Sequence, residues 1–471
     1  MSDAAHRPLD FAVLAMGGTL VRSGSRGGIF AGAAADSRQV APGQIFFALP
    51  GERTDGLRFV PQAAAAGAVA VVVPRGRATP PGSEEVAVIA VDDPRVALGD
   101  LARAVRAEFK GRVVGVTGSN GKTTTKELTA AALRPLGDVM RTPGNLNTDV
   151  GLPLAVLAAS GQEAAWVLEM AMRGRGEIAY LAALASPQIG VITNVAGAHL
   201  ERLGSIDEVA RAKGELFAGL GPDGVAVLPT DDPRIEAQAA PVAPGRRLRF
   251  DGGGPGGARA DVRVLDLVPA GAAGAVVRYA VRDAPVVTRL PLGGAHNARN
   301  GAAALAVALA AGVPPVEAAR ALETPALPPH RSATLMAGGR VVFDDCYNAN
   351  PASMHAALAT VASSTGGGRA FAVLGDMLEL GPDAEELHRE VGLDAGARLA
   401  GVVAVGALAG ALIDGARAVG LDPGRAVVEA SAEAAARRVA SWTAPGDWIL
   451  VKASRGMKLE QAVAALEAAL K

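Results

Sequence analysis

Short apolar runs alternate with longer Ala-rich stretches from one end of the chain to the other. The runs are dominated by Val, Ile and Leu and are long enough for buried strands, while the Ala-rich stretches suit helices that pack on one side. This alternation is typical of parallel sheets that are covered by helices. The strands that it predicts cover residues 44–49, 69–73, 86–91, 113–116, 165–170, 189–194, 225–229, 340–344, 371–375, 402–406 and 448–452.

Breaks in this alternation divide the chain. A predicted helix over about residues 95–109 precedes the strand at 113–116, and residues 325–329 form a stiff, proline-rich connector. The alternation then restarts near residue 335. A length of 471 residues is enough for about three domains that each bury a core. The sequence therefore predicts an α/β fold with three domains over residues 1–108, 109–325 and 326–471, the last of doubly wound type.

One segment of the middle domain departs from this pattern. Residues 251–275 are rich in Gly, Ala and Pro, and short stretches of alternating hydrophobicity cover residues 263–268 and 275–281. They predict a hairpin with a loose turn, to which we assign no chemistry.

Composition narrows the function. Lys and Arg number 46 against 47 Asp and Glu, so the net charge is −1, and we expect no nucleic-acid partner because such a surface needs a basic excess. The most apolar stretch, residues 301–313, is shorter than the roughly 20 residues of a membrane span. Residues 1–8 lack the apolar region of a secretory signal, and the one cysteine, Cys346, fits a reducing compartment. We expect a cytoplasmic monomer without a membrane partner.

Residues 113–127 carry the strongest functional signal. An apolar strand leads into a Gly-rich turn that ends at Gly121, and Lys122, Thr123 and a helix-compatible stretch follow. Backbone N–H groups of such a loop bind phosphate oxygens, the lysine adds a full positive charge, and the hydroxyl can bind Mg²⁺. Val116 stands where the strict phosphate-loop pattern has glycine. The alternative is a strand–helix turn that holds nothing.

Three further residues in the middle domain could take part in chemistry. Glu169 ends a predicted strand, where a carboxylate can hold Mg²⁺, although a salt bridge to Arg173 is an equal alternative. His199 follows another strand, and a lone histidine is usually a structural hydrogen-bonding residue. Lys213 lies on a predicted helix over 206–217, where lysine is normally solvated, but its neighbours are small enough to allow a close approach.

Two polar groups lie further along the chain. His296, Asn297 and Asn300 stand at the start of an Ala-rich helix, where asparagine can cap the helix or read the edge of a base. Asp344 and Asp345 follow a β-branched strand, and an Asp at that position can hydrogen-bond a ribose hydroxyl.

Taken in order, these segments resemble the ATP-dependent Mur ligases of bacterial cell-wall synthesis. The order and spacing extend over all three predicted domains, which makes the resemblance far more specific than any single motif. Ala196, Ala453 and Cys346 depart from the family's usual residues, but no charged or metal-binding position is lost. The segments that carry the resemblance are residues 117–125, Glu169, 193–194, His199, 212–213, 296–297, Arg331 and Asp345.

Further segments resemble one member of the family in particular. That member acts last and joins D-alanyl-D-alanine to a UDP-N-acetylmuramoyl tripeptide through an acyl phosphate. These two small molecules are therefore the expected substrates. The segments are residues 36–38 with Gly43 and Phe47, 168–170, 347–351, 375–377 and 379–381.

The resemblance also implies a fold and cofactors. It implies an N-terminal domain that binds the UDP moiety, a central ATPase-like domain with a parallel sheet, and a Rossmann-like C-terminal domain. It implies ATP and two Mg²⁺ ions, the first held by Thr123 and Glu169. The second would be held by His199 and by Lys213, whose amine would be carbamylated. Lys122, His199 and Lys213 would be the catalytic residues.

Binding residues follow from the same resemblance. Those expected at ATP are Gly118, Ser119, Asn120, Gly121, Lys122, Thr123, Thr124, Asn297, Arg331 and Asp345. Those expected at the UDP-linked peptide and the incoming dipeptide are Ser37, Arg38, Asn145, Asn147, Asn348 and Asn350.

Two other functions stay open. The first is another Mur-type ligase or a polyglutamate ligase. The Mur ligase that adds the third residue usually carries Asp-Tyr-Ala-His near its last-domain Asp, whereas residues 345–348 read Asp-Cys-Tyr-Asn. The second is a regulatory ATPase with a phosphate loop, which would hydrolyse ATP without forming an amide. The combination of Glu169, His199 and Lys213 favours the ligase.

Overall fold

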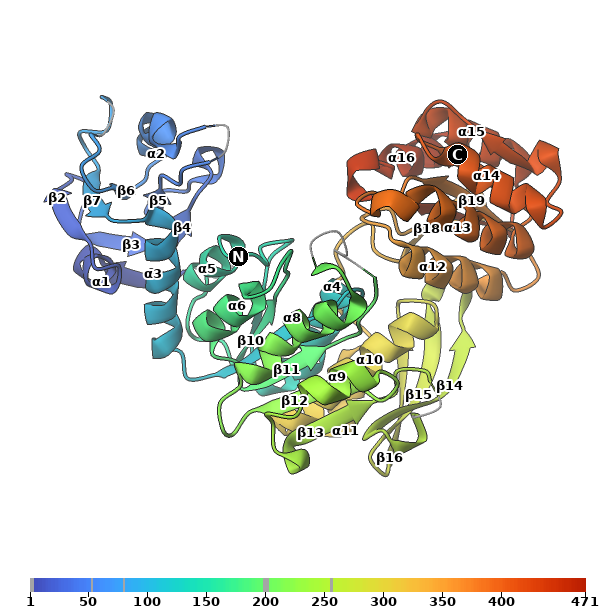
Figure 1. Cartoon of the computed structure of the whole chain (residues 1–471), viewed down its shortest axis with the longest axis horizontal. Helices are drawn as coiled ribbons and strands as arrows, with labels where there is room; N and C mark the ends of the chain where they lie inside the picture. The colour runs from blue at the N-terminus through green and yellow to red at the C-terminus, as the bar shows by residue number, and fades with distance from the viewer. Residues whose placement is uncertain (1–3, 52–53, 79–80, 198–202, 255–256) are drawn as a thin grey trace. The chain divides into compact units, whose positions relative to one another are not determined.

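The computed structural model describes residues 4–51, 54–78, 81–197, 203–254 and 257–471 (Figure 1). The chain forms two compact units. The first unit comprises Met1–Thr117, Leu136–Gly190 and Glu215–Gly224, and the second comprises Gly118–Pro135, Val191–Gly214 and Val225–Lys471. None of the described helices combines the length and the hydropathy that a membrane span requires.

The first unit begins with a five-stranded sheet in the order β2-β7-β6-β5-β4. β2 is antiparallel to β7 and the other pairs are parallel. β1 (His6–Pro8) pairs with β3 (Ile29–Ala31) outside this sheet. The strands are β2 (Thr19–Arg22), β4 (Ala33–Ala34), β5 (Ile45–Phe47), β6 (Ala70–Pro74) and β7 (Ala87–Val91), and the helices are α1 (Leu9–Ala15), α2 (Val60–Ala65) and α3 (Pro94–Glu108).

Helix α3 shows how local sequence sets an element. The Asp93 side chain accepts hydrogen bonds from the N–H groups of Arg95 and Val96, and Pro94 occupies the first helical position. Proline is tolerated there because that N–H has no helical partner. The helix predicted over 95–109 is therefore confirmed.

A nine-stranded sheet follows, in the order β16-β15-β14-β13-β12-β11-β8-β10-β9. The predicted hairpin is confirmed, since β14 and β15 pair antiparallel, and β16 extends it by a third strand. Strands β9, β13 and β16 were not predicted. The bounds are β8 (Arg112–Thr117), β9 (Val139–Arg141), β10 (Ala165–Glu169), β11 (Ile189–Ile192), β12 (Val225–Pro229), β13 (Arg247–Phe250), β14 (Val262–Pro269), β15 (Ala275–Val281) and β16 (Ala284–Leu290).

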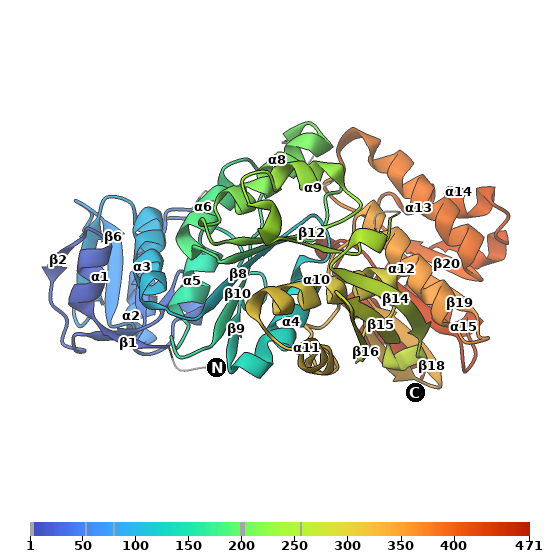
Figure 2. The same cartoon turned by 90° about the horizontal axis from the view of Figure 1, so that it is seen from below.

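The helices of this region are Ala-rich where they pack closely. α10 packs against α4 (Figure 2), and seven of its twelve buried residues are Ala, which lets the two helices approach each other. The bounds are α4 (Lys122–Leu133), α5 (Gly151–Leu157), α6 (Glu177–Ala185), α8 (Ile206–Ala218), α9 (Pro233–Gln238), α10 (Ala295–Ala311) and α11 (Pro315–Ala321).

The C-terminal part of the second unit is a six-stranded sheet in the order β17-β18-β22-β19-β20-β21. β17 is antiparallel to β18, and the pairs from β18 to β21 are parallel. The strands are β17 (Ala333–Ala337), β18 (Arg340–Asp344), β19 (Ala370–Gly375), β20 (Gly401–Val405), β21 (Ala426–Val428) and β22 (Trp448–Lys452).

Both faces of this sheet are covered by helices, as Figure 1 shows. Val341 and Phe343 of β18 pack into the core on one face, and Val342 packs into the core on the other. Such two-sided burial is typical of doubly wound sheets, and the predicted α/β fold is confirmed. The domain boundaries at 108/109 and 325/326 stay predictions. The helices are α12 (Pro351–Ser364), α13 (Ala384–Arg398) and α14 (Ala409–Ala418) on the first face, and α15 (Ala432–Trp442) and α16 (Glu460–Ala469) on the second.

Candidate functional site

The predicted phosphate loop joins β8 to α4, and two of its glycines have no substitute. Gly118 and Gly121 have φ values of +149° and +76°. A Cβ atom on Gly118 would lie 1.9 Å from Thr193 Oγ1, and one on Gly121 would lie 2.6 Å from Asn300 Oδ1. Gly121 is the N-cap of α4 and caps it with no side chain. The first N–H groups of α4 can therefore donate hydrogen bonds to an anion.

A neighbouring segment of the second unit holds the loop in place. Asn120 donates its N–H to Asn194 Oδ1 at 2.9 Å, and its carbonyl accepts from Thr193 Oγ1 at 2.6 Å and from Asn194 Nδ2 at 3.0 Å. Ser119 donates its N–H to the Asn194 carbonyl and its hydroxyl to the Ala196 carbonyl. The sequence marked residues 193–194 as a motif, and the structure shows that they brace the loop.

Lys122 and the two threonines after it begin helix α4. Lys122 Nζ donates to the carbonyls of Gly118 at 2.8 Å and Ser119 at 3.0 Å, so its ammonium group lies against its own loop. Thr123 is buried and Thr124 is half-buried. The positive charge of Lys122 therefore adds to the partial positive charge at the N-terminus of α4.

Lys213 is buried on α8, with 2% of its surface exposed. Burial first, and the positive charge of Lys122 second, hold the pKa of Lys213 well below its ordinary value of 10.5. Burial disfavours the charged form of an amine, because an ammonium group loses its hydration there. His199, the other residue expected at this metal site, lies outside the described residues.

The start of α10 is tied to the loop helix. Asn297 is fully buried; its Nδ2 donates to the Gly293 carbonyl at 2.8 Å, and its Oδ1 accepts from Asn300 Nδ2 at 3.2 Å. Asn300 in turn accepts from Thr125 Oγ1 at 3.3 Å on α4. Burial lowers the pKa of His296 to about 4, which keeps its ring neutral at pH 7. The asparagines thus connect α10 to α4.

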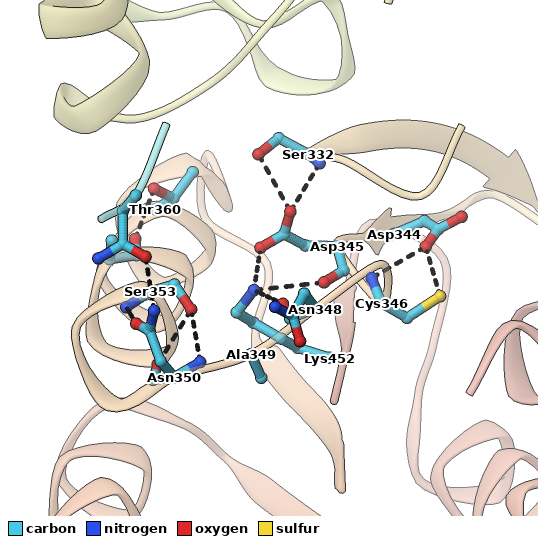
Figure 3. A network of polar contacts seen from close by, with 12 residues as sticks. Ser332, Asp344, Asp345, Cys346, Asn348, Ala349, Asn350, Ser353, Thr360 and Lys452 are labelled. Carbon is cyan, nitrogen blue, oxygen red and sulfur yellow. Dashed lines mark hydrogen bonds and ion pairs between the residues drawn. The ribbon is translucent and has the colours of Figure 1, made fainter. Parts of the chain in front are cut away.

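Asp345 lies in a network at the end of β18 (Figure 3). Its Oδ2 is 2.5 Å from Lys452 Nζ, and its Oδ1 accepts from the Ser332 N–H at 2.9 Å. Lys452 is 2% exposed and also donates to the Asn348 carbonyl at 2.9 Å. The sequence placed 448–452 as a strand without a role for Lys452; only its proximity to Asp345 reveals that role.

Arg331 and Asn350 lie near this network. The Arg331 guanidinium stacks on the Tyr347 ring, 3.9 Å from its centre. Asn350 is the N-cap of α12, where its Oδ1 accepts from the Ser353 N–H at 2.9 Å. Its Nδ2 donates to Asn120 Oδ1 at 2.6 Å, which joins α12 to the phosphate loop. No feature of the sequence predicted this contact.

The first unit contains the remaining predicted residues. Glu169 ends β10, is 2% exposed, and its Oε1 accepts from Asn147 Nδ2 at 2.8 Å. Asn145 is exposed in the turn before Asn147.

The residues predicted at the UDP moiety form local contacts. Ser37 is buried and donates to Gln62 Oε1 at 2.8 Å. Arg38 is largely exposed and pairs with Asp36 at 2.6 Å, and its hydrogen bond lowers the pKa of that carboxyl.

Known families match almost the whole chain. The Mur ligase family catalytic domain matches residues 30–106, the Mur ligase middle domain matches 116–308, and the domain described as "Mur ligase, glutamate ligase domain" matches 330–455. A curated protein of Bacillus subtilis (strain 168) is 37% identical over 455 residues, which cover 95% of each chain. The chain belongs to the Mur ligase family.

Two relatives that are more than 30% identical to this chain have the same name. The Bacillus subtilis protein is named UDP-N-acetylmuramoyl-tripeptide–D-alanyl-D-alanine ligase. A protein of Escherichia coli (strain K12) with the same name is 36% identical and covers 76% of this chain and 77% of its own length.

Solved Mur ligase structures share the architecture. MurF from Acinetobacter baumannii has a TM-score of 0.86 and 29% identity, covering 99% of this chain and 100% of its own. MurF from Thermotoga maritima, solved in complex with ADP, has a TM-score of 0.79 and 29% identity, covering 93% and 97%. The predicted three-domain architecture is therefore confirmed. A folylpolyglutamate synthase of Mycobacterium tuberculosis, at 19% identity and a TM-score of 0.63, shares the fold alone.

Proposed function

We propose that the chain is an ATP-dependent ligase that joins D-alanyl-D-alanine to UDP-N-acetylmuramoyl tripeptide during the synthesis of peptidoglycan precursors. The relatives that match it over nearly their whole length are named for this reaction. The structural observation that carries the proposal is the buried Lys213, whose pKa is depressed in part by Lys122. A regulatory ATPase needs the phosphate loop but has no evident use for a second, buried lysine.

ATP binding is supported by the loop and by the likeness to a structure that contains ADP. The N–H groups at the start of α4 and the ammonium of Lys122 suit the phosphate oxygens. Arg331 and Asp345 remain proposed contacts to phosphate and ribose, and Lys452 would orient the Asp345 carboxylate. Asn297 remains a proposed adenine contact, and its hydrogen bonds to Gly293 and Asn300 fix its amide plane.

Mg²⁺ suits the donor atoms of several residues. Thr123 offers a hydroxyl and Glu169 a carboxylate, which are ligands that Mg²⁺ prefers. Lys213 in its ammonium form has no lone pair and therefore offers Mg²⁺ no ligand atom. Its neutral amine can attack CO₂ to form a carbamate and release one proton, and that product is an oxygen ligand which could act with His199. Bound Mg²⁺ would offset the negative charge of ATP and the substrate carboxylate.

The proposed reaction has two steps. The carboxylate of the tripeptide attacks the γ-phosphate of ATP, and an acyl phosphate and ADP form. The amine of D-alanyl-D-alanine then attacks the acyl carbon, and an amide and inorganic phosphate form. Lys122 and the N–H groups of α4 stabilise the charge that develops on the transferred phosphoryl group. Asn145, Asn147, Asn348 and Asn350 remain proposed substrate contacts, as do Ser37 and Arg38 for the UDP moiety.

The expected setting is part of the same proposal. We expect the chain to act in the cytoplasm, as a monomer and without nucleic acid. The near-neutral net charge of −1 supports the last point.

One assay separates the candidate functions. Purified protein is incubated with ATP, Mg²⁺ and the UDP-linked tripeptide, with and without D-alanyl-D-alanine, and ADP release is measured alongside the mass of the product. We expect turnover that depends on the dipeptide, and a product with one new amide. ADP release indifferent to both substrates would overturn the ligase and favour a regulatory ATPase. Turnover with a free amino acid instead would place the chain at another step of the family.

A further inference from the structure

Three side chains with metal-binding atoms lie together in the C-terminal part of the second unit. His330 Nδ1 is 2.7 Å from Asp344 Oδ2, and Cys346 Sγ donates a hydrogen bond to Asp344 Oδ1 at 3.0 Å. The nitrogen, oxygen and sulfur atoms all lie within 4.8 Å of one another. Figure 3 shows Asp344 facing Cys346. Asp344 and Cys346 are buried, whereas the His330 side chain is 31% exposed, which leaves a route from solvent.

The charges of this cluster suit a divalent cation. Asp344 joins the other two residues, with His330 at one carboxylate oxygen and Cys346 at the other. The Cys346 thiol carries its proton, since Sγ donates a hydrogen bond to Asp344 Oδ1. A cation that replaced this proton would meet a thiolate, a carboxylate and the imidazole of His330. The two negative charges would match its own charge.

The donor atoms indicate which cation would bind. Thiolate and imidazole bind borderline-soft ions such as Zn²⁺ and Co²⁺, whereas Mg²⁺ prefers oxygen ligands. Three protein ligands with one side open leave a fourth position for water. The cluster is therefore selective against the ion expected at the phosphate loop.

The backbone holds the histidine in an unusual conformation. His330 has a φ of +64° and Ser332 a φ of +50°. A residue other than glycine in the left-handed region costs about 1 kcal/mol and needs support from its surroundings. Here the carbonyl of His330 accepts the Tyr347 N–H at 3.0 Å, and its ring contacts Asp344. The two segments that supply the ligands are thus fixed to each other.

We propose that His330, Asp344 and Cys346 bind one thiophilic divalent cation of the Zn²⁺ class, and that its binding slows the ligase. Binding exchanges the thiol proton of Cys346 for the metal, and that proton passes to solvent. The imidazole of His330 would bind through whichever ring nitrogen carries no proton, and its own proton would stay on the other. The second part rests on the proposed function. Arg331 follows His330, and Asp345 follows Asp344, so an ion that joins His330 to Asp344 would restrict two residues proposed to contact the nucleotide.

Cobalt provides a direct test of binding. The protein, saturated with Mg²⁺, is titrated with Co²⁺ and its absorption spectrum is recorded. Cys346 is the one cysteine in the sequence, so a sulfur-to-cobalt charge-transfer band in the near-ultraviolet can come from no other thiolate. We expect this band, saturating at one Co²⁺ per chain, and we expect added Zn²⁺ to abolish it by displacement.

Single-residue variants test whether Cys346 and His330 are ligands. Cys346→Ser keeps a hydroxyl that can donate to Asp344, and should lose the band entirely. His330→Asn tolerates the left-handed backbone, and should weaken binding at least about tenfold, as losing a metal's supporting group does. A band in wild-type protein that His330→Asn leaves unchanged would overturn the site, and so would the absence of any band. Neither readout depends on ligase activity.

The effect on turnover is tested separately. Micromolar Zn²⁺ should reduce dipeptide-dependent ADP release by wild-type protein, and Cys346→Ser should resist it by at least about tenfold in concentration. Equal inhibition of both proteins would overturn the second part of the proposal. If the protein shows the cobalt band but no ligase turnover at all, the proposed function fails while the metal site stands.

Discussion

The phosphate loop and the network around Asp345 hold their charged groups in different ways. In the loop, Lys122 is held by neutral carbonyl groups three and four residues away along the chain. In the network, Lys452 is held by the carboxylate of Asp345, more than a hundred residues earlier in the sequence. Lys452 is buried, whereas Lys122 is half-buried. A change in the loop should therefore affect turnover more than folding, and a change in the network should affect folding first.

The largest expected effect lies in the loop. Lys122→Met removes the positive charge that meets the phosphates, and we expect dipeptide-dependent turnover to fall about 1000-fold, as when one charge-stabilising donor is lost. The free energy of unfolding should change by about 1 kcal/mol, because the hydrogen bonds that Lys122 donates go to the neutral carbonyls of Gly118 and Ser119 and contribute little net stability. ADP release and urea unfolding measure the two quantities. Turnover within tenfold of wild type would contradict the role of Lys122.

The network should respond in the opposite way. Asp345→Asn leaves the buried ammonium of Lys452 without its carboxylate, and we expect a loss of about 3 kcal/mol in the free energy of unfolding. The double variant Asp345→Asn, Lys452→Met removes both charges and should recover most of this loss. Urea unfolding of the two single variants and the double variant gives the coupling. Additive losses would show that the pair is not coupled.

Lys213 differs from both lysines, because it is buried like Lys452 and its burial lowers its pKa. Between that lowered pKa and 10.5, the unfolded chain binds a proton that the folded chain does not. Wild-type stability should therefore rise with pH across this window, by up to about 1.4 kcal/mol per pH unit. Lys213→Met has no such proton, so its stability advantage should be largest at low pH and shrink as the pH rises. Urea unfolding in CO₂-free buffer at several pH values measures this, and parallel curves would refute the depressed pKa.

The smallest effect concerns the contact that joins the two regions. Asn350→Ala removes both the cap of α12 and the hydrogen bond to Asn120, and should cost about 1 kcal/mol. Asn350→Asp keeps an oxygen for the Ser353 N–H but has no amide to donate to Asn120, so it should cost less than half as much. Thermal unfolding compares the two variants. Equal losses would mean that the contact with Asn120, and not the cap, supplies the stability.

The sequence predicted much of the fold because buried parallel strands are apolar runs. The runs at 69–73 and 225–229 became β6 and β12 with nearly unchanged bounds. It missed β13 and β9, which are short and carry Arg among their apolar residues. Such strands form because a neighbouring strand offers hydrogen bonds, and this pairing cannot be predicted from the hydrophobicity of the segment itself.

The sequence by itself determined the phosphate loop, because its glycines, its lysine and the start of α4 are consecutive residues. Backbone conformation and a helix N-terminus are local properties, and a short motif is enough to specify them. Tertiary structure alone decided which groups are buried and which distant residues meet. It buries Lys213 and so lowers its pKa, pairs Asp345 with Lys452, and places Asn350 on Asn120. Burial and distance depend on the packing of the whole chain, and they set the charge of a group as well as its partners.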